Sequence, residues 1–156
     1  MERVVGMGEY IVTDRKEDVL RTFALASCVA VTAYDPERKA AGMIHVVLPT
    51  PIRQGDEVNR PAYYASTGVP LMITTLCRGY GCRKEELRIQ MYGGADSTLQ
   101  QDIFSIGKKN IDAVKRSLLG MGLTIQKADL RGSASRTLAM NTNTGLVEVF
   151  RQPMGK

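Results

Sequence analysis

The sequence is poor in the side chains that most often carry chemistry. It has one histidine, His45, and three cysteines, Cys28, Cys77 and Cys82. Zinc needs more ligands than one imidazole and the Cys77–Cys82 pair supply, so neither a metal nor another cofactor is predicted. An odd cysteine count leaves at least one thiol unpaired, which is typical of a reducing compartment rather than of a disulfide-stabilised secreted domain.

Other absences narrow the class of protein further. There is no apolar run of membrane-spanning length, no signal peptide, and neither a Walker-type nor a GxGxxG loop, so we expect a cytoplasmic protein without membrane insertion or nucleotide binding. A length of 156 residues without repeats or linkers predicts one domain over residues 1–156. The net charge of +5 favours an acidic partner, but the basic residues are scattered and do not predict nucleic-acid binding.

Two kinds of hydrophobic periodicity run through the chain. Alternating or β-branched apolar residues predict about eight strands, and a 3.6-residue spacing predicts two helices. The first helix would be capped by Ser66 or Thr67, with Pro70 in its first turn and Gly79 or Gly81 at its end. The second would cover Ile106–Met121, and Pro49–Pro61 would be a loop. The fold class predicted is α+β: a single-domain sandwich of mixed or antiparallel sheets with two helices packed outside. The predicted strands are two short ones within Val4–Val12, then Val19–Leu25, two around Asp35–Arg38, Glu86–Tyr92, Leu123–Asp129, Arg136–Met140 and Leu146–Arg151.

The stretch Ala24–Pro49 is the most informative part of the sequence. Two apolar runs flank Asp35-Pro36-Glu37-Arg38, which predicts a strand, a turn and a strand. If Asp35 pairs with Arg38, then Cys28 lies directly opposite His45, with Cβ atoms about 4.5–5.5 Å apart. This proximity depends on the register, since a slip of one residue would place the two side chains on opposite faces.

A lone cysteine beside a lone histidine has two interpretations. As a catalytic pair, an imidazolium lowers the thiol pKa, the thiolate attacks an acyl carbon, and the imidazole protonates the leaving amine. As structural residues, Cys28 is a small core side chain in an apolar strand and His45 is a buried polar residue with its hydrogen bonds satisfied. The spacing alone leaves both open. Cys77 and Cys82 add a third hypothesis, a thiol redox switch.

The ordered set of motifs along the chain resembles the CheD family of chemoreceptor glutamine deamidases. The resemblance rests on residues 25–31, on residues 45–49, on Tyr64-Ala65, on Gly93-Gly94-Ala95, and on residues 106–110, followed by Asp129, Gly132, Arg136 and Thr144-Gly145. It implies a cysteine amidohydrolase in which Cys28 is the nucleophile, His45 the base and Thr22 the residue that orients the histidine. It also implies that Ser27, Gly93, Gly94 and Arg136 bind substrate or shape its site.

The resemblance carries expectations about partners as well. Family members deamidate glutamine side chains on methyl-accepting receptors, some hydrolyse methyl esters there, and some bind the phosphatase CheC. We therefore expect chemoreceptor cytoplasmic helices as substrate and a CheC-like phosphatase as a further partner. The alternative is a module that binds a signalling partner without turnover, and only the enzyme requires a depressed pKa at Cys28.

Three positions depart from the family pattern. Ala26, Arg131 and Ser135 stand where the family usually has glycine. If those glycines adopt a positive φ or let a substrate helix approach closely, rate or substrate choice would differ here.

Overall fold

Two sheets and two long helices make up the computed structural model, which describes residues 1–96 and 105–154. One sheet has five strands in the order β2-β5-β4-β6-β7, and the other has four in the order β1-β3-β8-β9. The pairs β1–β3 and β6–β7 are parallel and the remaining pairs antiparallel. The strands are β1 Glu2–Val4, β2 Tyr10–Thr13, β3 Val19–Leu25, β4 Val29–Asp35, β5 Ala40–Val46, β6 Arg88–Gly93, β7 Ile125–Leu130, β8 Ala134–Asn141 and β9 Val147–Pro153; the helices are α1 Asp56–Asn59, α2 Ala65–Tyr80 and α3 Ile106–Gly120.

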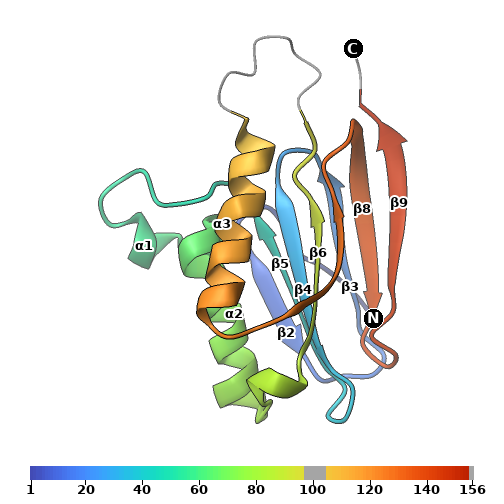
Figure 1. Cartoon of the computed structure of the whole chain (residues 1–156). Coiled ribbons are helices and arrows are strands. Elements are labelled where there is room, and N and C mark those ends of the chain that lie inside the picture. The colour runs from blue at the N-terminus through green and yellow to red at the C-terminus, as the bar shows by residue number, and fades with distance from the viewer. Residues whose placement is uncertain (97–104, 155–156) are drawn as a thin grey trace.

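The elements form three layers, and the central layer is the five-stranded sheet. Figure 1 shows α2 and α3 on one side of this sheet and β3, β8 and β9 on the other. Strands β4 and β5 are buried along their whole length because both of their faces are covered. Val31 and Ile44 face the helices, whereas Ala30 and Met43 face the second sheet. The predicted α+β sandwich with two outer helices is confirmed.

The β4–β5 hairpin has a different register from the one predicted. Asp35 pairs with Ala40 rather than with Arg38, so the loop has four residues, and Lys39 adopts a left-handed φ of 52°. His45 therefore lies opposite Ala30, and Cys28 precedes the strand instead of facing His45 across the ladder. The prediction of direct opposition is wrong. The shift is two positions, however, and a two-residue shift preserves the face on which each side chain lies.

The helices begin and end near the predicted residues, with one clear error at the start of α2. Its N-cap is Tyr64, neither Ser66 nor Thr67, and Pro70 lies inside the helix rather than in its first turn. The amides of Ala65 and Ser66 donate to the carbonyls of Leu48 and Pro49, so backbone groups replace the expected side-chain cap.

The predicted end of the first helix and the predicted bounds of the second agree with the structure. Gly81 ends α2 with a left-handed φ of 75°, and α3 matches the predicted Ile106–Met121 to within one residue. The predicted loop Pro49–Pro61 also contains the short helix α1. No helix among the described residues is long and apolar enough to cross a lipid bilayer.

The β4–β5 loop depends on one buried carboxylate. Asp35 is fully buried and accepts hydrogen bonds from the amides of Glu37 and Arg38 and from the Arg38 guanidinium. We predict that Asp35→Ala lowers the free energy of unfolding by about 1–3 kcal/mol, because it removes the buried acceptor of three partly buried hydrogen bonds. Urea denaturation measures the effect, and Glu37→Ala, at an exposed position of the same loop, is the control. Equal stability of the two variants would contradict this role.

Candidate active site

Cys28 lies where the chain crosses from one sheet to the other. Strand β3 belongs to the four-stranded sheet and β4 to the five-stranded sheet, so residues 26–28 connect the two layers. A bulge between Thr22 and Leu25, with Ala24 at a φ of 54°, precedes this crossing. Cys28 is partly exposed and packs against the apolar cluster between the sheets. The thiol therefore lies at the border between the inter-sheet space and solvent.

His45 enters the same inter-sheet space from β5. Its neighbours along the strand, Ile44 and Val46, face the helices, so the side chain of His45 faces the opposite way. Its ring is hydrogen-bonded to Thr22, which lies on the other sheet. Only 2% of the residue is exposed. Its partner across the ladder, Ala30, lies two positions after Cys28 on the same face, a diagonal relationship that long side chains can span.

Thr22 fixes the proton of the imidazole. Its Oγ1 lies 2.7 Å from the carbonyl oxygen of Val5, to which the hydroxyl must donate, and 2.7 Å from Nδ1 of His45. With its one proton given to Val5, the hydroxyl oxygen accepts from Nδ1–H. The neutral imidazole consequently keeps its lone pair on Nε2, which is buried and has no hydrogen-bond partner within the described part of the chain. Thr22 thus presents a free base between the sheets.

Burial determines the resting charge of this pair. Desolvation raises the pKa of the Cys28 thiol to about 11 and lowers the pKa of His45 to about 4. At neutral pH the free protein holds a neutral thiol and a neutral imidazole. The expected depressed pKa of Cys28 is therefore wrong for the free protein, in which burial favours the neutral thiol.

The loop after β6 holds the backbone around Cys28. The amide of Gly94 donates to the carbonyl of Cys28 at 2.8 Å, and the amide of Ala95 donates to the carbonyl of Ala26 at 2.7 Å. Gly93 has a φ of 109°, and a Cβ there would lie 2.3 Å from the Cys28 carbonyl oxygen. Gly93 thus allows a close backbone approach to Cys28, whereas Gly94, with a φ of 63°, allows a close approach of α3, since a Cβ there would lie 2.5 Å from the Ile111 side chain.

Ser27 and Arg136, also expected to shape the site, act through backbone contacts. The carbonyl of Ser27 accepts a hydrogen bond from the side chain of Asn110 at 2.9 Å. Arg136 is 4% exposed, donates to the carbonyls of Arg131 and Ala134, and pairs with Asp129. Its guanidinium holds the β7–β8 loop together and is already fully engaged.

The departures from the family pattern differ in their effects. Arg131 has a φ of 65°, so a side chain stands where the backbone favours glycine. Its guanidinium binds Asp96 through two hydrogen bonds of 3.0 and 2.8 Å. Ala26 and Ser135 do not adopt positive φ, so neither is strained by its side chain.

The other two cysteines lie away from this centre. Cys82 is buried and its thiol is hydrogen-bonded to Asp35, while Cys77 is partly exposed on α2. Burial raises the pKa of Cys82 to about 12, which disfavours the thiolate that redox exchange requires. Within residues 1–96 and 105–154 no group of three His, Cys, Asp or Glu side chains is arranged to hold a metal ion.

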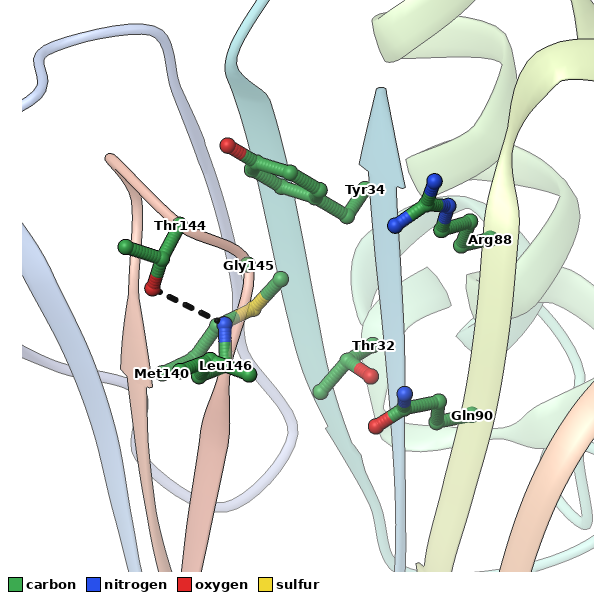
Figure 2. A pocket seen from close by; sticks show the side chains of 8 residues that line it. All are labelled: Thr32, Tyr34, Arg88, Gln90, Met140, Thr144, Gly145 and Leu146. Carbon is green, nitrogen blue, oxygen red and sulfur yellow. Dashed lines mark hydrogen bonds between the residues drawn. The ribbon is translucent and has the colours of Figure 1, made fainter. Parts of the chain in front are cut away.

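A small hollow of about 100 Å³ lies between the sheets, beside the end of β4 remote from Cys28. Figure 2 shows Thr32, Tyr34, Arg88 and Gln90 on one side of it and the β8–β9 turn on the other. It contains none of the predicted site residues, and Thr32 is four positions along β4 from Cys28, or about 13 Å. The hollow is separate from the Cys28–His45 centre.

Two contributors were missed by sequence reasoning. The Val5 carbonyl, which orients Thr22, leaves no side-chain signal in a sequence. Asn110 did leave a signal in the sequence. It is a polar residue at a helical spacing that places it with Ile111 and Val114 on the buried face of α3.

Comparison with known proteins gives consistent matches. A family model described as CheD chemotactic sensory transduction matches residues 47–151, a segment that begins after both Cys28 and His45. A probable chemoreceptor glutamine deamidase CheD of Syntrophotalea carbinolica is 40% identical over 148 residues, covering 94% of this chain and 91% of the relative. The chemoreceptor glutamine deamidase CheD of Thermotoga maritima is 35% identical over 145 residues, covering 93% and 88%. A probable one of Thermococcus kodakarensis is 33% identical over 158 residues, covering 100% and 96%.

A solved structure shares the fold. The crystal structure of the Bacillus licheniformis hypothetical protein YfiH superposes with a TM-score of 0.52 at 17% identity. The match covers 80% of this chain and 49% of that one, so this chain spans about half its length. At this identity the likeness supports the fold alone.

The Thr22 bridge leads to a prediction with a matched control. Thr22→Val keeps the shape of the side chain but leaves the buried Nδ1–H of His45 without an acceptor and frees the imidazole to change tautomer. We expect kcat to fall about 10-fold or more while the fold is retained, and Thr22→Ser to remain near the wild type. Nitrogen chemical shifts of the His45 ring report the tautomer directly. Wild-type rates in Thr22→Val would remove Thr22 from the mechanism.

Proposed function

Because the chain belongs to the CheD family, we propose that Cys28, His45 and Thr22 carry out the deamidation of chemoreceptor glutamines. The protein is a chemoreceptor glutamine deamidase, an amide hydrolase acting in chemotaxis. The observation that carries the assignment of residues is the Thr22–His45 hydrogen bond, which leaves a buried, unpartnered Nε2 in the space against which Cys28 packs. A base held without a partner between two sheets is costly unless a substrate or a nucleophile uses it.

In the first half of the reaction, Nε2 of His45 takes the proton of the Cys28 thiol as the sulfur attacks the δ-carbon of the glutamine side chain. The imidazolium that forms donates this proton to the amide nitrogen, the carbon–nitrogen bond breaks, and ammonia leaves. The product is a thioester between Cys28 and the substrate. Thr22 stabilises the imidazolium by accepting its Nδ1–H throughout.

In the second half, Nε2 removes a proton from water as the water oxygen attacks the thioester carbonyl. The carbon–sulfur bond breaks, the imidazolium returns the proton to the sulfur, and a glutamate side chain is released. The net change is the addition of one water and the loss of one ammonia. No redox partner is needed.

The backbone amide of Cys28 is the proposed oxyanion donor. The carbonyls of Ala26, Ser27 and Cys28 are all occupied by donors from Ala95, Asn110 and Gly94, which fixes the orientation of the peptide groups. The Cys28 amide itself has no acceptor within the described part of the chain. One such preoriented donor contributes roughly 2.7–4 kcal/mol to stabilisation of the transition state.

We propose a helical, acidic segment of the receptor as the bound form of the substrate. The excess of 21 Lys and Arg over 16 Asp and Glu attracts such a segment and makes association sensitive to salt. Arg136 is buried and pairs with Asp129, and Arg131 pairs with Asp96, so a carboxylate of free glutamine would have to compete with an existing partner at either guanidinium. Contacts to remote parts of a protein substrate would instead position the amide. A CheC-like phosphatase partner and a cytoplasmic location stay predictions of the resemblance.

Turnover of a receptor fragment tests this proposal. We predict that mass spectrometry will show conversion of glutamine to glutamate in a receptor cytoplasmic fragment, and that an ammonia assay will show much slower release from free glutamine. Cys28→Ala and His45→Ala should lose conversion by about 10³-fold or more, because both groups act as a unit. Cys77→Ala is the matched cysteine control and should convert at the wild-type rate.

The alternatives give other outcomes. Faster release from free glutamine would indicate a small-molecule amidase. Binding of the fragment without conversion would indicate a binding module. Conversion that survives Cys28→Ala would refute the assignment of the nucleophile while leaving the activity intact.

The pH dependence follows from the neutral resting pair. The active form has a neutral imidazole, which exists above the lowered His45 pKa of about 4. We predict a kcat/KM that changes less than about two-fold between about pH 6 and pH 9, since kcat/KM reports the groups of the free enzyme. Stopped assays with the receptor fragment across this range measure it. An acidic limb near the ordinary histidine pKa would show instead that the pKa of His45 is not lowered in the free protein, and a loss of kcat/KM on the alkaline side of this range would show that a thiolate–imidazolium pair is the active form.

A further inference from the structure

One side chain of α3 joins the two segments that carry Cys28 and His45. The two hydrogens of the Asn110 amide are donated to the carbonyl of Ser27 and to the carbonyl of Val47, each at 2.9 Å. Ser27 directly precedes Cys28, and Val47 follows His45 by two positions. Because Nδ2 faces two carbonyl oxygens, the orientation of the amide is fixed by its partners.

The presence of a polar residue here is not explained by helix packing. Asn110 is completely buried, with 0% of its surface exposed. It lies on the same face of α3 as Gly107, Ile111 and Val114. Its Oδ1 is buried and has no partner within the described part of the chain, which is a cost to stability. An apolar side chain would avoid that cost but would leave the carbonyls of Ser27 and Val47 without this donor, so what the amide adds is a link between these two segments.

The surrounding contacts make the connection rigid. A Cβ on Gly107 would lie 2.5 Å from the Ala95 carbonyl oxygen and 2.7 Å from that of Gly94, so α3 rests directly on the loop whose amides bond to Ala26 and Cys28. Asn110 is one helical turn further along. Helix, loop and the Cys28 segment are thus in successive contact, and among residues 1–96 and 105–154 only the Asn110 amide donates to both carbonyls.

We propose that Asn110 is a positioning residue of the deamidase, whose side-chain amide fixes the Cys28 segment against the end of the strand that carries His45. The inference rests on the proposed roles of Cys28 and His45. Neither Asn110 bond touches substrate, so its contribution is the alignment of the sulfur with Nε2. A displacement of about 1 Å between reacting groups can lower a rate about 100-fold.

The test compares Asn110→Ala with Val114→Ala, a cavity-forming change at a fully buried position one turn along the same helix. Both are assayed below their melting transitions for kcat and KM on the receptor fragment. Iodoacetamide labelling rates of Cys28 and Cys82 are measured by peptide mapping. Cys82 is 5% exposed and lies outside the site, so its labelling reports loss of the overall fold.

We expect Asn110→Ala to lower kcat about 10- to 100-fold with KM within about two-fold of the wild type. Labelling of Cys28 should rise in the same variant, because a released segment exposes the thiol and relieves the desolvation that raises its pKa. Labelling of Cys82 should stay unchanged. Val114→Ala should lower the melting temperature without altering kcat or Cys28 labelling.

Opposite changes in turnover and in Cys28 labelling are not produced by instability alone. A wild-type kcat in Asn110→Ala, an equal loss in Val114→Ala, or a joint rise of Cys28 and Cys82 labelling would overturn the proposal. If Asn110→Ala does not fold, Asn110→Asp keeps the shape, replaces the donors with carboxylate oxygens, and is expected to behave in the same way. Failure of the catalytic assignment would be seen separately, as turnover that survives Cys28→Ala.

Discussion

The hydrogen bond between Thr22 and His45 is the contact on which the site depends. It joins the two sheets through a pair of fully or almost fully buried polar side chains, and Val5 completes it by taking the threonine proton. A buried imidazole would otherwise leave Nδ1–H unpaired, at a cost comparable to that of a lost hydrogen bond. With Nδ1 satisfied, the remaining nitrogen is the basic one. Selection of the tautomer and a polar link between the two sheets are thus consequences of one contact, made within the apolar cluster that packs the sheets together.

The same burial that orients the base also suppresses its charge. Cys28 and His45 both lie against the apolar cluster between the sheets, where desolvation favours the uncharged form of each. Because the thiolate is the reactive species, a raised pKa of Cys28 disfavours oxidation and adventitious alkylation of this thiol. Reactivity would then arise only with a substrate carbonyl in place, where attack and proton transfer proceed together. This favours selectivity for a protein substrate that can supply binding energy from outside the reacting amide.

Much of the support for Cys28 comes from backbone groups. Carbonyls at residues 26–28 are held by the amides of Gly94 and Ala95 and by Asn110, and Gly93 is required to be small by its approach to the Cys28 carbonyl. Cys28 therefore lies on a short connection whose carbonyls at residues 26–28 are all hydrogen-bonded, although it belongs to neither sheet. A connection that crosses between layers is well suited to this, because each layer anchors one of its ends.

The sequence by itself determined the alternation of strands and helices, because apolar spacing and glycine stops are local signals, and it singled out Cys28 and His45 by their scarcity. Family-specific residues added Thr22. The tertiary structure alone decided the register of β4 with β5, since a four-residue loop with a left-handed Lys39 is not distinguishable in sequence from a shorter turn. It alone decided the protonation of the pair, because desolvation depends on what packs around a side chain. Finally, it revealed the roles of the Val5 carbonyl and the Asn110 amide, which join segments distant in the chain and so leave no local pattern that states what they bind.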